Sequence, residues 1–558
     1  MLNKKLKYAQ RYNEIIKAFL RNGFGYIMQD LGLTEALSFS LKKDKAYSNI
    51  DQKTIGERLR NLLQELGTTF IKLGQLASTR RDIFPEGIIS ELEKLQTKVS
   101  PFPFSQVRET FEKELQTPIE HIFETFSEEP FATGSIGQVH LAKLKSGETA
   151  AVKVQRPNIQ SVIETDLEIL YDIAKLMDSK LDWAKKYNLL EVIDELSQSI
   201  LQELDFSIEG KNAEKIGKQF KQDETVHIPK IYWEYSTKKV LTMEYLKGIQ
   251  INNVAKLDEI GIDRKKIAEK FAQCMFEQIL LNGYFHGDPH PGNVIVMGKG
   301  TIGLLDFGNV GHLNENMRKT LVSFLINLQK GDSEKLVQVL LQMGLAPKDI
   351  NYARLQSDVE KIRDSYYDRP LGEISIGDVI NDMFSTIMKY NIQIPAEYTI
   401  LGRSLVTIEG IISYLDPTCN IFEIIEPYTK TFMKEYYHPK NFVKTSIQEM
   451  MEWKEFMSSL PKTLKKLIGT AESGEFYFKI SMPELNLMLK KLDEVINRLS
   501  FAIVLLAFSI VMVGLIIGSS LSGEDSLLWK FPIIEIGAII ASLMFLFLLF
   551  SIFRSGKF

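Results

Sequence analysis

The sequence of 558 residues has little cysteine, no large charge excess of either sign and no internal repeats. Its two cysteines are Cys274 and Cys419. Because Cys274 lies within a helical pattern, we expect free thiols in a reducing compartment rather than a disulfide framework. The formal net charge of −4 lacks the basic excess typical of nucleic-acid binding, so we expect no nucleic-acid partner. The first 20 residues contain no uninterrupted apolar run, which argues against a signal peptide.

Long apolar runs occur only in the last part of the sequence. Residues 501–521 carry no charge, and a helix rising about 1.5 Å per residue would span a hydrocarbon core of ~30 Å over this length. A second run covers 532–553 and is broken only by Glu535 near its start. A buried helical hairpin in a large soluble core is the alternative. We expect a transmembrane hairpin of two helices, at 501–521 and 532–553.

Basic residues predict how this hairpin is oriented. They flank both runs on the same side of the membrane: Lys490, Lys491, Arg498, Arg554 and Lys557. Because cytoplasmic flanks carry the basic excess, we expect a multi-pass protein of the cell inner (cytoplasmic) membrane with both ends in the cytoplasm. Gly514 and Gly518 offer a close-packing face to the partner helix or to a second protomer. Membrane lipids are therefore expected partners, and a homodimer through the hairpin is one arrangement that the glycines allow.

The stretch that points most directly to chemistry is HGDPHPGNVIVMGKGTIGLLDFG at 286–308. Asp288, Asn293 and Asp306 follow the order and spacing of a phosphoryl-transfer site. In such a site one carboxylate orients the nucleophile, while an amide and a second carboxylate hold Mg²⁺. Apolar runs on both sides of the Gly-Lys-Gly turn predict a hairpin that brings Asn293 and Asp306 together. A polar turn between two buried strands is the alternative.

An earlier pair of strands resembles a phosphate-binding hairpin. The first strand covers about 136–144 and follows a run of small residues, and the returning strand at 150–154 contains Lys153. Backbone of small residues can approach phosphates closely, and Lys153 would then reach phosphate oxygens. An outward-pointing lysine on an edge strand is the alternative. The candidate nucleotide-contacting segment is Ala132, Thr133, Gly134, Ser135, Ile136, Gly137, Gln138 and Val139.

Two acidic residues stand out in a mostly helical stretch from 158 to about 220. Glu203 and Glu209 are six residues apart, so on a helix they would face different directions and could serve different cations. A solvated acidic helix is the alternative. Strand-like runs at 228–234 and 238–245 then complete a first lobe.

The segment that leaves this lobe reads as a hinge whose backbone could bind an adenine edge, with Glu244 and Leu246 as its candidate residues. The next predicted element is a helix at 264–282 that ends at Gly283. Beyond residue 314 the periodicity is helical as far as residue 500.

Helices are also predicted before the first lobe. Residues 1–45 form a basic amphipathic pattern, for which membrane-surface contact and a solvated face are both open. A longer helix is expected from Ile55 to about Arg80, and short helices at 86–97 and 118–126. The longer helix contains Lys72 and Gln75. A lysine there needs an anionic partner if it is buried, whereas a surface lysine is the default.

The motifs together have the order of a protein kinase, although the HGDPHPGN loop lacks the arginine of the protein-kinase catalytic loop and looks more like that of small-molecule kinases. KLGQ at 72–75, SIGQVH at 135–140, VKVQRP at 152–157, ELDF with Glu209 and Asn212, HGDPHPGN and LLDFG resemble the UbiB (AarF/ADCK) family of atypical protein-kinase-like proteins. The resemblance covers about 50–330 and extends to the membrane hairpin.

The resemblance implies a role for each matching residue, with ATP and Mg²⁺ as cofactors. Lys153 would pair with Glu209 and contact the α- and β-phosphates. Asp288 would be the catalytic base, and Asn293 and Asp306 would hold the metal. The helix with Lys72 would fold over the place where a peptide would bind, with Lys72 paired to Glu203 and Gln75 near the nucleotide. The family usually has an alanine-rich loop where this chain has Gly134, which leaves its nucleotide preference open.

The implied function is that of a membrane-anchored atypical kinase or ATPase that supports the biosynthesis of an isoprenoid quinone, ubiquinone or menaquinone. Quinone precursors or quinone-biosynthesis enzymes would be its partners. A small-molecule or lipid kinase and a nucleotide-binding, non-catalytic scaffold of a biosynthetic complex are the alternatives.

The predicted fold class is α+β, a bilobal protein-kinase-like fold with a helical N-terminal extension, a largely helical C-lobe and a C-terminal transmembrane helical hairpin. The kinase-like domain would lie in the cytoplasm. The predicted units, in chain order, are basic amphipathic helices at 1–50, the KxGQ extension at 51–127, the N-lobe at 128–247, the C-lobe at 248–440, a helical linker at 441–500, and the transmembrane helices at 501–521 and 532–553.

Overall fold

The computed structural model describes residues 2–31, 54–81, 83–95, 100–186, 188–347, 350–367 and 375–436, together with isolated positions between 499 and 543. The chain divides into a unit from Met1 to Val443 and a unit from Lys444 to Phe558. Within the described part of the chain, no helix is long and apolar enough to cross a membrane. The predicted linker and the two predicted transmembrane helices lie outside the described residues, apart from those isolated positions.

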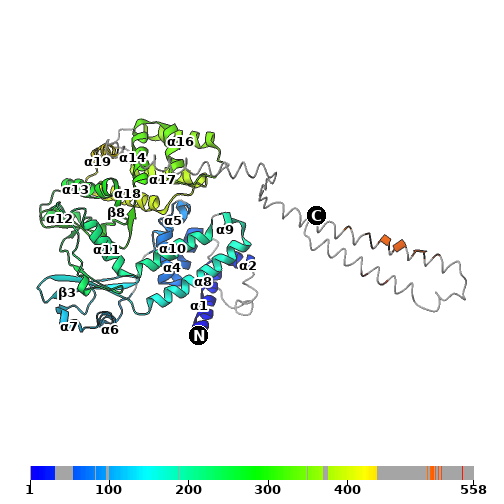
Figure 1. Cartoon of the computed structure of the whole chain (residues 1–558), viewed down its shortest axis with the longest axis horizontal. Coiled ribbons are helices and arrows are strands. Elements are labelled where there is room, and N and C mark those ends of the chain that lie inside the picture. The colour runs from blue at the N-terminus through cyan, green and yellow to red at the C-terminus, as the bar shows by residue number, and fades with distance from the viewer. Residues whose placement is uncertain are drawn as a thin grey trace, which may run out of the picture. The chain divides into compact units, whose positions relative to one another are not determined.

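The N-lobe is built on a five-stranded antiparallel sheet in the order β1-β3-β4-β6, with β2 paired to β3 (Figure 1). Its strands are β1 (Phe123–Phe126), β2 (Ala132–Thr133), β3 (Gly137–Leu144), β4 (Thr149–Gln155) and β6 (Val240–Glu244). The predicted hairpin of β3 and β4 is confirmed, with Val139 opposite Lys153. Gly147 makes its turn at a φ of 95°, a conformation that favours glycine.

One strand prediction and one helix prediction in this lobe are wrong. The expected strand at 228–234 is a single bridge between Ile231 and Met243, followed by a short 3₁₀ turn, η4 (Trp233–Tyr235). The expected helix at 118–126 ends early, because α7 (Ile119–Ile122) gives way to β1. Phe123 and Phe126 of this strand pack against Phe111, so burial of aromatic rings decides the strand conformation there.

The N-terminal extension consists of α1 (Leu2–Arg21), α2 (Gly25–Asp30), α3 (Ile55–Leu66), α4 (Thr68–Ala77), α5 (Glu86–Leu92) and α6 (Phe104–Leu115). The single long helix expected from Ile55 to Arg80 is wrong. Gly67, at a φ of 88°, separates α3 from α4. On α1 the apolar residues Ile15 and Ile16 are buried in the core, so this part of the amphipathic face packs within the protein.

Four helices connect the first strands to β6: α8 (Ile159–Lys180), α9 (Asp182–Lys186), α10 (Leu189–Glu203) and α11 (Phe206–Gly217). Arg11 of α1 donates to Asp166 of α8 at 2.7 Å, and this carboxylate is almost fully buried. Helix α10 contacts both α8 and α4. The extension therefore docks on these helices rather than standing apart from the lobe.

The C-lobe begins with small strands. They are β5 (Val226–His227), β7 (Ile249–Gln250), β8 (Tyr284–His286), β9 (Val294–Met297), β10 (Thr301–Leu304) and β11 (Val310–His312). Four of them form a sheet in the order β5-β10-β9-β7, and β8 pairs with β11. The hairpin predicted around the Gly-Lys-Gly turn is confirmed, with Leu304 opposite Val294.

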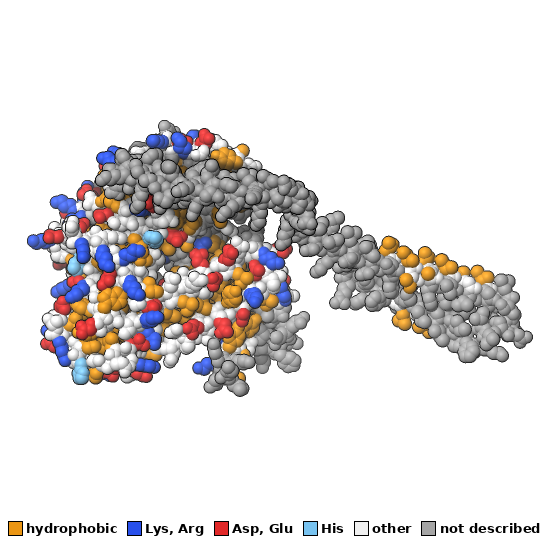
Figure 2. Space-filling view, in the orientation of Figure 1, with side chains coloured by type: hydrophobic (Ala, Val, Ile, Leu, Met, Phe, Trp, Pro, Cys, Tyr) orange, Lys and Arg blue, Asp and Glu red, His pale blue; other side chains and the backbone are white. Residues whose placement is uncertain are grey.

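Helices make up the rest of the C-lobe, as the periodicity predicts for its described residues (Figure 1). They are α12 (Val254–Glu259), α13 (Arg264–Phe276), α14 (Glu315–Lys330), α15 (Ser333–Met343), α16 (Tyr352–Tyr367), α17 (Ile376–Lys389), α18 (Ala396–Leu415) and α19 (Ile421–Tyr436). Helix α13 continues as a π-helix, η5 (Glu277–Asn282), and ends at the left-handed Gly283, as expected. On the face seen in Figure 2, acidic and basic side chains are interspersed over both lobes.

Candidate active site

A cavity of about 1380 Å³ is lined by residues of the N-lobe, the C-lobe and the N-terminal extension. All but one of the predicted site residues line it. They are Lys72, Gln75, Ala132, Thr133, Gly134, Ser135, Ile136, Gly137, Val139, Lys153, Glu203, Glu209, Glu244, Leu246, Asp288, Asn293 and Asp306. Residues that lie far apart in the sequence therefore share one site, although the chemical role of each remains a prediction.

Gln138 is the exception. Its side chain is buried and bonded on the other side of the strand, where Oε1 accepts from the N–H of Phe102 at 3.1 Å and Nε2 donates to the carbonyl of Phe102 at 3.2 Å. Strand alternation explains the error, because Gln138 lies between Gly137 and Val139, which line the cavity. The side chain of Gln138 anchors the segment before α6 instead of facing this cavity.

A buried ion pair joins the sheet to α11. Nζ of Lys153 lies 2.6 Å from Oε2 of Glu209, whose side chain is only 7% exposed. Burial lowers the pKa of Lys153, but the carboxylates of Glu209 and Asp306 outweigh it, and the net pKa lies above the ordinary value. Lys153 is therefore a fixed cation in the cavity, as phosphate binding requires.

The loop with Asp288 is held from behind by buried polar groups. The pKa of His286 lies below its ordinary 6.5, because burial outweighs the effect of the Leu305 carbonyl. The ring is then neutral. Its Nε2 donates to the carbonyl of Leu305 at 2.9 Å and its Nδ1 accepts from the N–H of Asp288 at 3.2 Å. The second histidine of the motif, His290, accepts from the backbone N–H of Gly292 through its Nδ1 at 3.2 Å. His286 therefore helps to position the backbone at Asp288.

The π-helix and α18 complete this support. Gln278 of the π-helix is fully buried, and its Oε1 accepts from the backbone N–H of His286 at 3.0 Å. The hydroxyl of Ser404, also fully buried, donates to the carbonyl of Gly287 at 3.0 Å. A π-bulge often occurs beside a functional site, and here it turns Gln278 toward the loop.

Asn293 and Asp306 could hold a magnesium ion. Nδ2 of Asn293 donates to the carbonyl of Asp288 at 3.2 Å, which leaves its oxygen as the free ligand atom. Burial raises the pKa of Asp306, but Lys153 and the N–H of Gly308 outweigh it, and the net pKa lies below its ordinary value. In the described part of the chain, no group of three or more His, Cys, Asp or Glu side chains could hold a metal. One carboxylate and one amide nevertheless fit Mg²⁺, which takes its other ligands from phosphates and water.

The extension contributes Lys72 to the lining of the cavity. Its Nζ lies 2.8 Å from Oε2 of Glu203, and both side chains are 21% exposed. Glu203 ends α10 and Glu209 lies in α11, so the two glutamates are on separate helices and serve separate lysines. Gln75 donates to the carbonyl of Leu95 at 3.1 Å. The pairing of Lys72 with Glu203 that the resemblance implies is present.

At the hinge, the side chain of Glu244 is held by two neighbours. Its carboxylate lies 3.0 Å from Nε2 of His227 and accepts from the backbone N–H of Lys230 at 3.1 Å. Because the carboxylate already has these two partners within the protein, a nucleobase would contact the backbone of the hinge instead. Leu246 is buried and lines the cavity beside it.

Several lining residues escaped the sequence reasoning. Arg403 of α18 lies 3.3 Å from Oδ1 of Asp288, so the loop that lacks an arginine gains one from a distant helix. The apolar side chains of Ala151, Met243 and Ile295 also line the cavity. These three apolar residues lie in or next to predicted strands, so the alternation of side chains between the two faces of a strand could have identified them. Arg403 lies within a long helical pattern that gave no such signal.

Asn212, a member of the ELDF motif region, links α11 to the loop of Asp306. Its Nδ2 donates to the carbonyl of Phe307 at 2.9 Å, and its Oδ1 accepts from the hydroxyl of Tyr284 at 2.7 Å. The helix that carries Glu209 is thus tied to the segment that contains Asp306. A shift of α11 would move the positions of Glu209 and Asp306 together.

The two lobes and this cleft define a protein-kinase-like protein with mixed helix and sheet. Family models agree: residues 94–340 match the ABC1 atypical kinase-like domain, 359–420 the UbiB helical domain and 483–554 the ABC1/UbiB kinase-like C-terminal domain. The chain belongs to the UbiB/ABC1 family of atypical kinase-like proteins.

The chain is also similar to individual proteins, one of which carries the UbiB name. The chain is 33% identical over 460 residues to a "Probable protein kinase UbiB" of Aliivibrio fischeri strain ES114, covering 81% of this chain and 84% of the relative. It is 32% identical to an "Uncharacterized protein in hydrogenase 1 5'region" of Clostridium pasteurianum, over 98% and 99% of the two chains. Among solved structures, a complex of Rv3197 with erythromycin from Mycobacterium tuberculosis matches at 23% identity and a TM-score of 0.47, over 65% of this chain and 93% of that one.

Proposed function

We propose that this protein is a membrane-anchored atypical kinase or ATPase that uses ATP and Mg²⁺ in a cleft closed to peptides and supports isoprenoid quinone biosynthesis. One observation carries the proposal: Lys153, Asp288, Asn293 and Asp306 line a single cavity. A scaffold that only bound nucleotide would not need this whole set. The relatives named as UbiB protein kinases support the kinase-like part of the proposal.

Each residue has a physical task in this proposal. Lys153 neutralises phosphate charge, and its buried partner Glu209 fixes the position of its ammonium group. Asp288 orients the attacking hydroxyl or water and accepts its proton as the bond from oxygen to the γ-phosphorus forms and ADP leaves. Mg²⁺ held by Asn293 and Asp306 would draw charge from the phosphates.

The restriction to non-peptide acceptors rests on the extension. Lys72 of α4 is paired with Glu203 at 2.8 Å, and both residues line the cavity that contains the candidate catalytic groups. An extended peptide would have to displace this helix. We therefore propose water or a small or lipid-borne molecule as the acceptor. Anchoring through 501–521 and 532–553 would hold the site at the membrane surface, near lipids, quinone precursors and the enzymes that process them.

The test compares wild type with Asp288→Asn and Asp306→Asn. We expect both variants to lose ATP turnover and to lower cellular quinone content, because Asp288 orients the nucleophile and Asp306 supplies a metal ligand. ATPase rates would be measured with and without anionic lipid and a phenolic quinone precursor. Full cellular function of Asp306→Asn would overturn the proposal in favour of a scaffold.

A small-molecule or lipid kinase is the second candidate, and the extent of the cavity favours it. The lining continues beyond the candidate nucleotide residues to Ser78, Arg80 and Thr407, so further polar side chains share the cavity with Asp288. Transfer of labelled γ-phosphate to an extracted lipid, instead of release of free phosphate, would identify this activity.

A further inference from the structure

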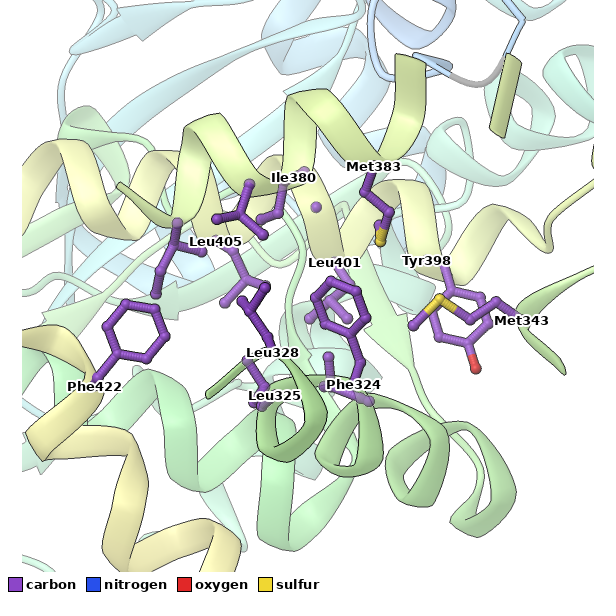
Figure 3. A pocket seen from close by; sticks show the side chains of 14 residues that line it. Phe324, Leu325, Leu328, Met343, Ile380, Met383, Tyr398, Leu401, Leu405 and Phe422 are labelled. Carbon is purple, nitrogen blue, oxygen red and sulfur yellow. The ribbon is translucent and has the colours of Figure 1, made fainter. Parts of the chain in front are cut away.

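A second cavity lies in the helical part of the C-lobe, and the proposed function does not use it. It has a volume of about 40 Å³, several times the ~10–15 Å³ that one water molecule needs by the same measure. Five helices contribute to its wall, represented by Phe324 of α14, Met343 of α15, Met383 of α17, Leu401 of α18 and Phe422 of α19 (Figure 3).

The wall is made of hydrocarbon, thioether and aromatic groups. Among the 14 described residues that line the cavity, none carries a charge or an amide side chain. The only side-chain hydroxyl belongs to Tyr398, and it shares a hydrogen bond with Thr320. A buried water needs two to four polar partners, and this wall does not supply them. The cavity therefore favours an apolar occupant.

The cavity is a local hollow beside a tightly packed helix crossing. At Gly402 an added Cβ would lie 2.6 Å from Cε2 of Phe384, so the ring of Phe384 on α17 packs directly against the backbone of α18. The cavity therefore lies beside tightly packed side chains and does not reflect loose packing of these helices as a whole. Met343 and Met383 both face it in Figure 3, and their unbranched, flexible side chains can adapt to a guest.

Helix α18 joins this cavity to the candidate active site. Leu401 and Leu405 line the apolar cavity, while Arg403, between them, lines the nucleotide cavity and lies 3.3 Å from Asp288. The next residue, Ser404, donates to the carbonyl of Gly287. A guest that displaces Leu401 or Leu405 would therefore move the helix that holds the loop of Asp288.

We propose that this cavity binds the apolar end of a branched hydrocarbon, of the size of about one isoprene unit, and that its occupancy shifts the nucleotide affinity through α18. The compact cavity and its aromatic and branched wall suit a short, bulky group better than an extended linear chain. The coupling to nucleotide rests on the proposed function, whereas binding of the hydrocarbon does not.

The test uses the full chain in phosphatidylcholine nanodiscs and a geranyl probe that carries a photoreactive diazirine. Peptides of α14 and α18 should be labelled, and excess geraniol should compete. Leu325→Phe fills the cavity from α14, away from the catalytic helix, and should reduce labelling at least fivefold. Ile326→Phe, at the next position of α14 but outside the lining, is the matched control and should label like wild type. Labelling that Leu325→Phe leaves unchanged would overturn the proposal.

Three further experiments distinguish the ways in which the proposal could be wrong. Val379→Ile adds a single methyl group from α17, and it replaces Leu325→Phe if that variant does not fold. A linear decyl diazirine probe tests the source of the hydrocarbon. Stronger labelling by the geranyl probe supports an isoprenoid, and stronger labelling by the decyl probe overturns that assignment in favour of a lipid chain.

Finally, geraniol should change the dissociation constant for ATP in wild type but not in Leu325→Phe. If the cavity is labelled but the dissociation constant for ATP does not change, the coupling is overturned and the binding of the hydrocarbon stands. Loss of ATP turnover in every variant would count against the proposed function and not against the binding of the hydrocarbon.

Discussion

Nη2 of Arg403 lies 3.3 Å from Oδ1 of Asp288, and each side chain is about one third exposed. Arg403 comes from α18, in the region that matches the UbiB helical domain, whereas Asp288 belongs to the ABC1 domain. The helical domain thus supplies the cation that the HGDPHPGN loop lacks. Because both groups line the same cavity, Arg403 would reach either Asp288 or, under the proposed function, a transferred phosphoryl group.

Replacement of Arg403 should therefore slow turnover more than it weakens nucleotide binding. Loss of one charge-stabilising donor typically costs on the order of 10²–10³ in kcat, and we expect Arg403→Gln to fall in the lower part of this range. The dissociation constant for ATP should stay within about threefold, since under the proposed function Lys153 would make the main phosphate contact. Single-turnover kinetics and calorimetric titration would measure the two quantities. Arg354→Gln, at an exposed position of α16, is the control. Equal losses of affinity and rate would contradict a role specific to the transition state.

The buried pair of Lys153 and Glu209 should behave as a unit. Removing one partner of a buried pair leaves an uncompensated charge and costs about 3–5 kcal/mol of stability. Lys153→Met should therefore lower the free energy of unfolding strongly, and adding Glu209→Leu should restore much of it without restoring turnover. Urea unfolding of wild type, both single variants and the double variant would measure this. Additive losses in the double variant would show that the two residues act independently.

The ion pair between Lys72 and Glu203 should restrain α4 without contributing much to global stability. Partly exposed pairs are worth roughly 0.2–1 kcal/mol, which corresponds to an up to about fivefold faster local opening. Lys72→Ala should therefore increase hydrogen exchange in residues 68–77. Arg108→Ala, which removes a more exposed pair with Glu120, is the matched control. Unchanged exchange in α4 would argue that packing, not this pair, holds the helix.

Gly134 should influence nucleotide preference rather than folding. An added Cβ would meet only the carbonyl of Gly137 at 3.5 Å, an ordinary contact, so Gly134→Ala is sterically tolerated. Alanine restricts the backbone of the phosphate-binding run. We expect the ratio of the affinities for ATP and ADP to change while the melting temperature stays the same. Parallel titrations with both nucleotides test this, and an unchanged ratio would rule the effect out.

His286 predicts a pH dependence of stability. Burial lowers its pKa below the ordinary 6.5, so the unfolded chain binds a proton that the folded chain excludes. The stabilisation is present above about pH 6.5 and is lost as the pH falls from there toward the folded-state pKa. His286→Asn should flatten the slope of unfolding free energy between about pH 5 and 7. Denaturant titrations at several pH values would measure it. A slope equal to that of wild type would contradict a buried neutral imidazole.

Much of the site could be predicted because its motifs are local. Asn293 and Asp306 flank a hairpin whose turn and apolar runs are legible in the sequence, and the backbone N–H of Leu305 donates to the carbonyl of Asn293 at 2.8 Å. Lys153 lies on a strand of a predicted hairpin in the same way. Gln138 was misassigned because a motif does not indicate which side of a strand faces the ligand.

The sequence by itself determined the order of the chemical groups, the two hairpins that carry them and the family to which they belong. Only the tertiary structure decided that Gly67 breaks the KxGQ helix, that Arg403 reaches Asp288, and that an apolar cavity lies on the other side of α18. The physical reason is the range of the interactions. Turns and alternating strands are set by neighbouring residues, whereas ion pairs between distant helices and unfilled space in a core depend on how whole elements pack.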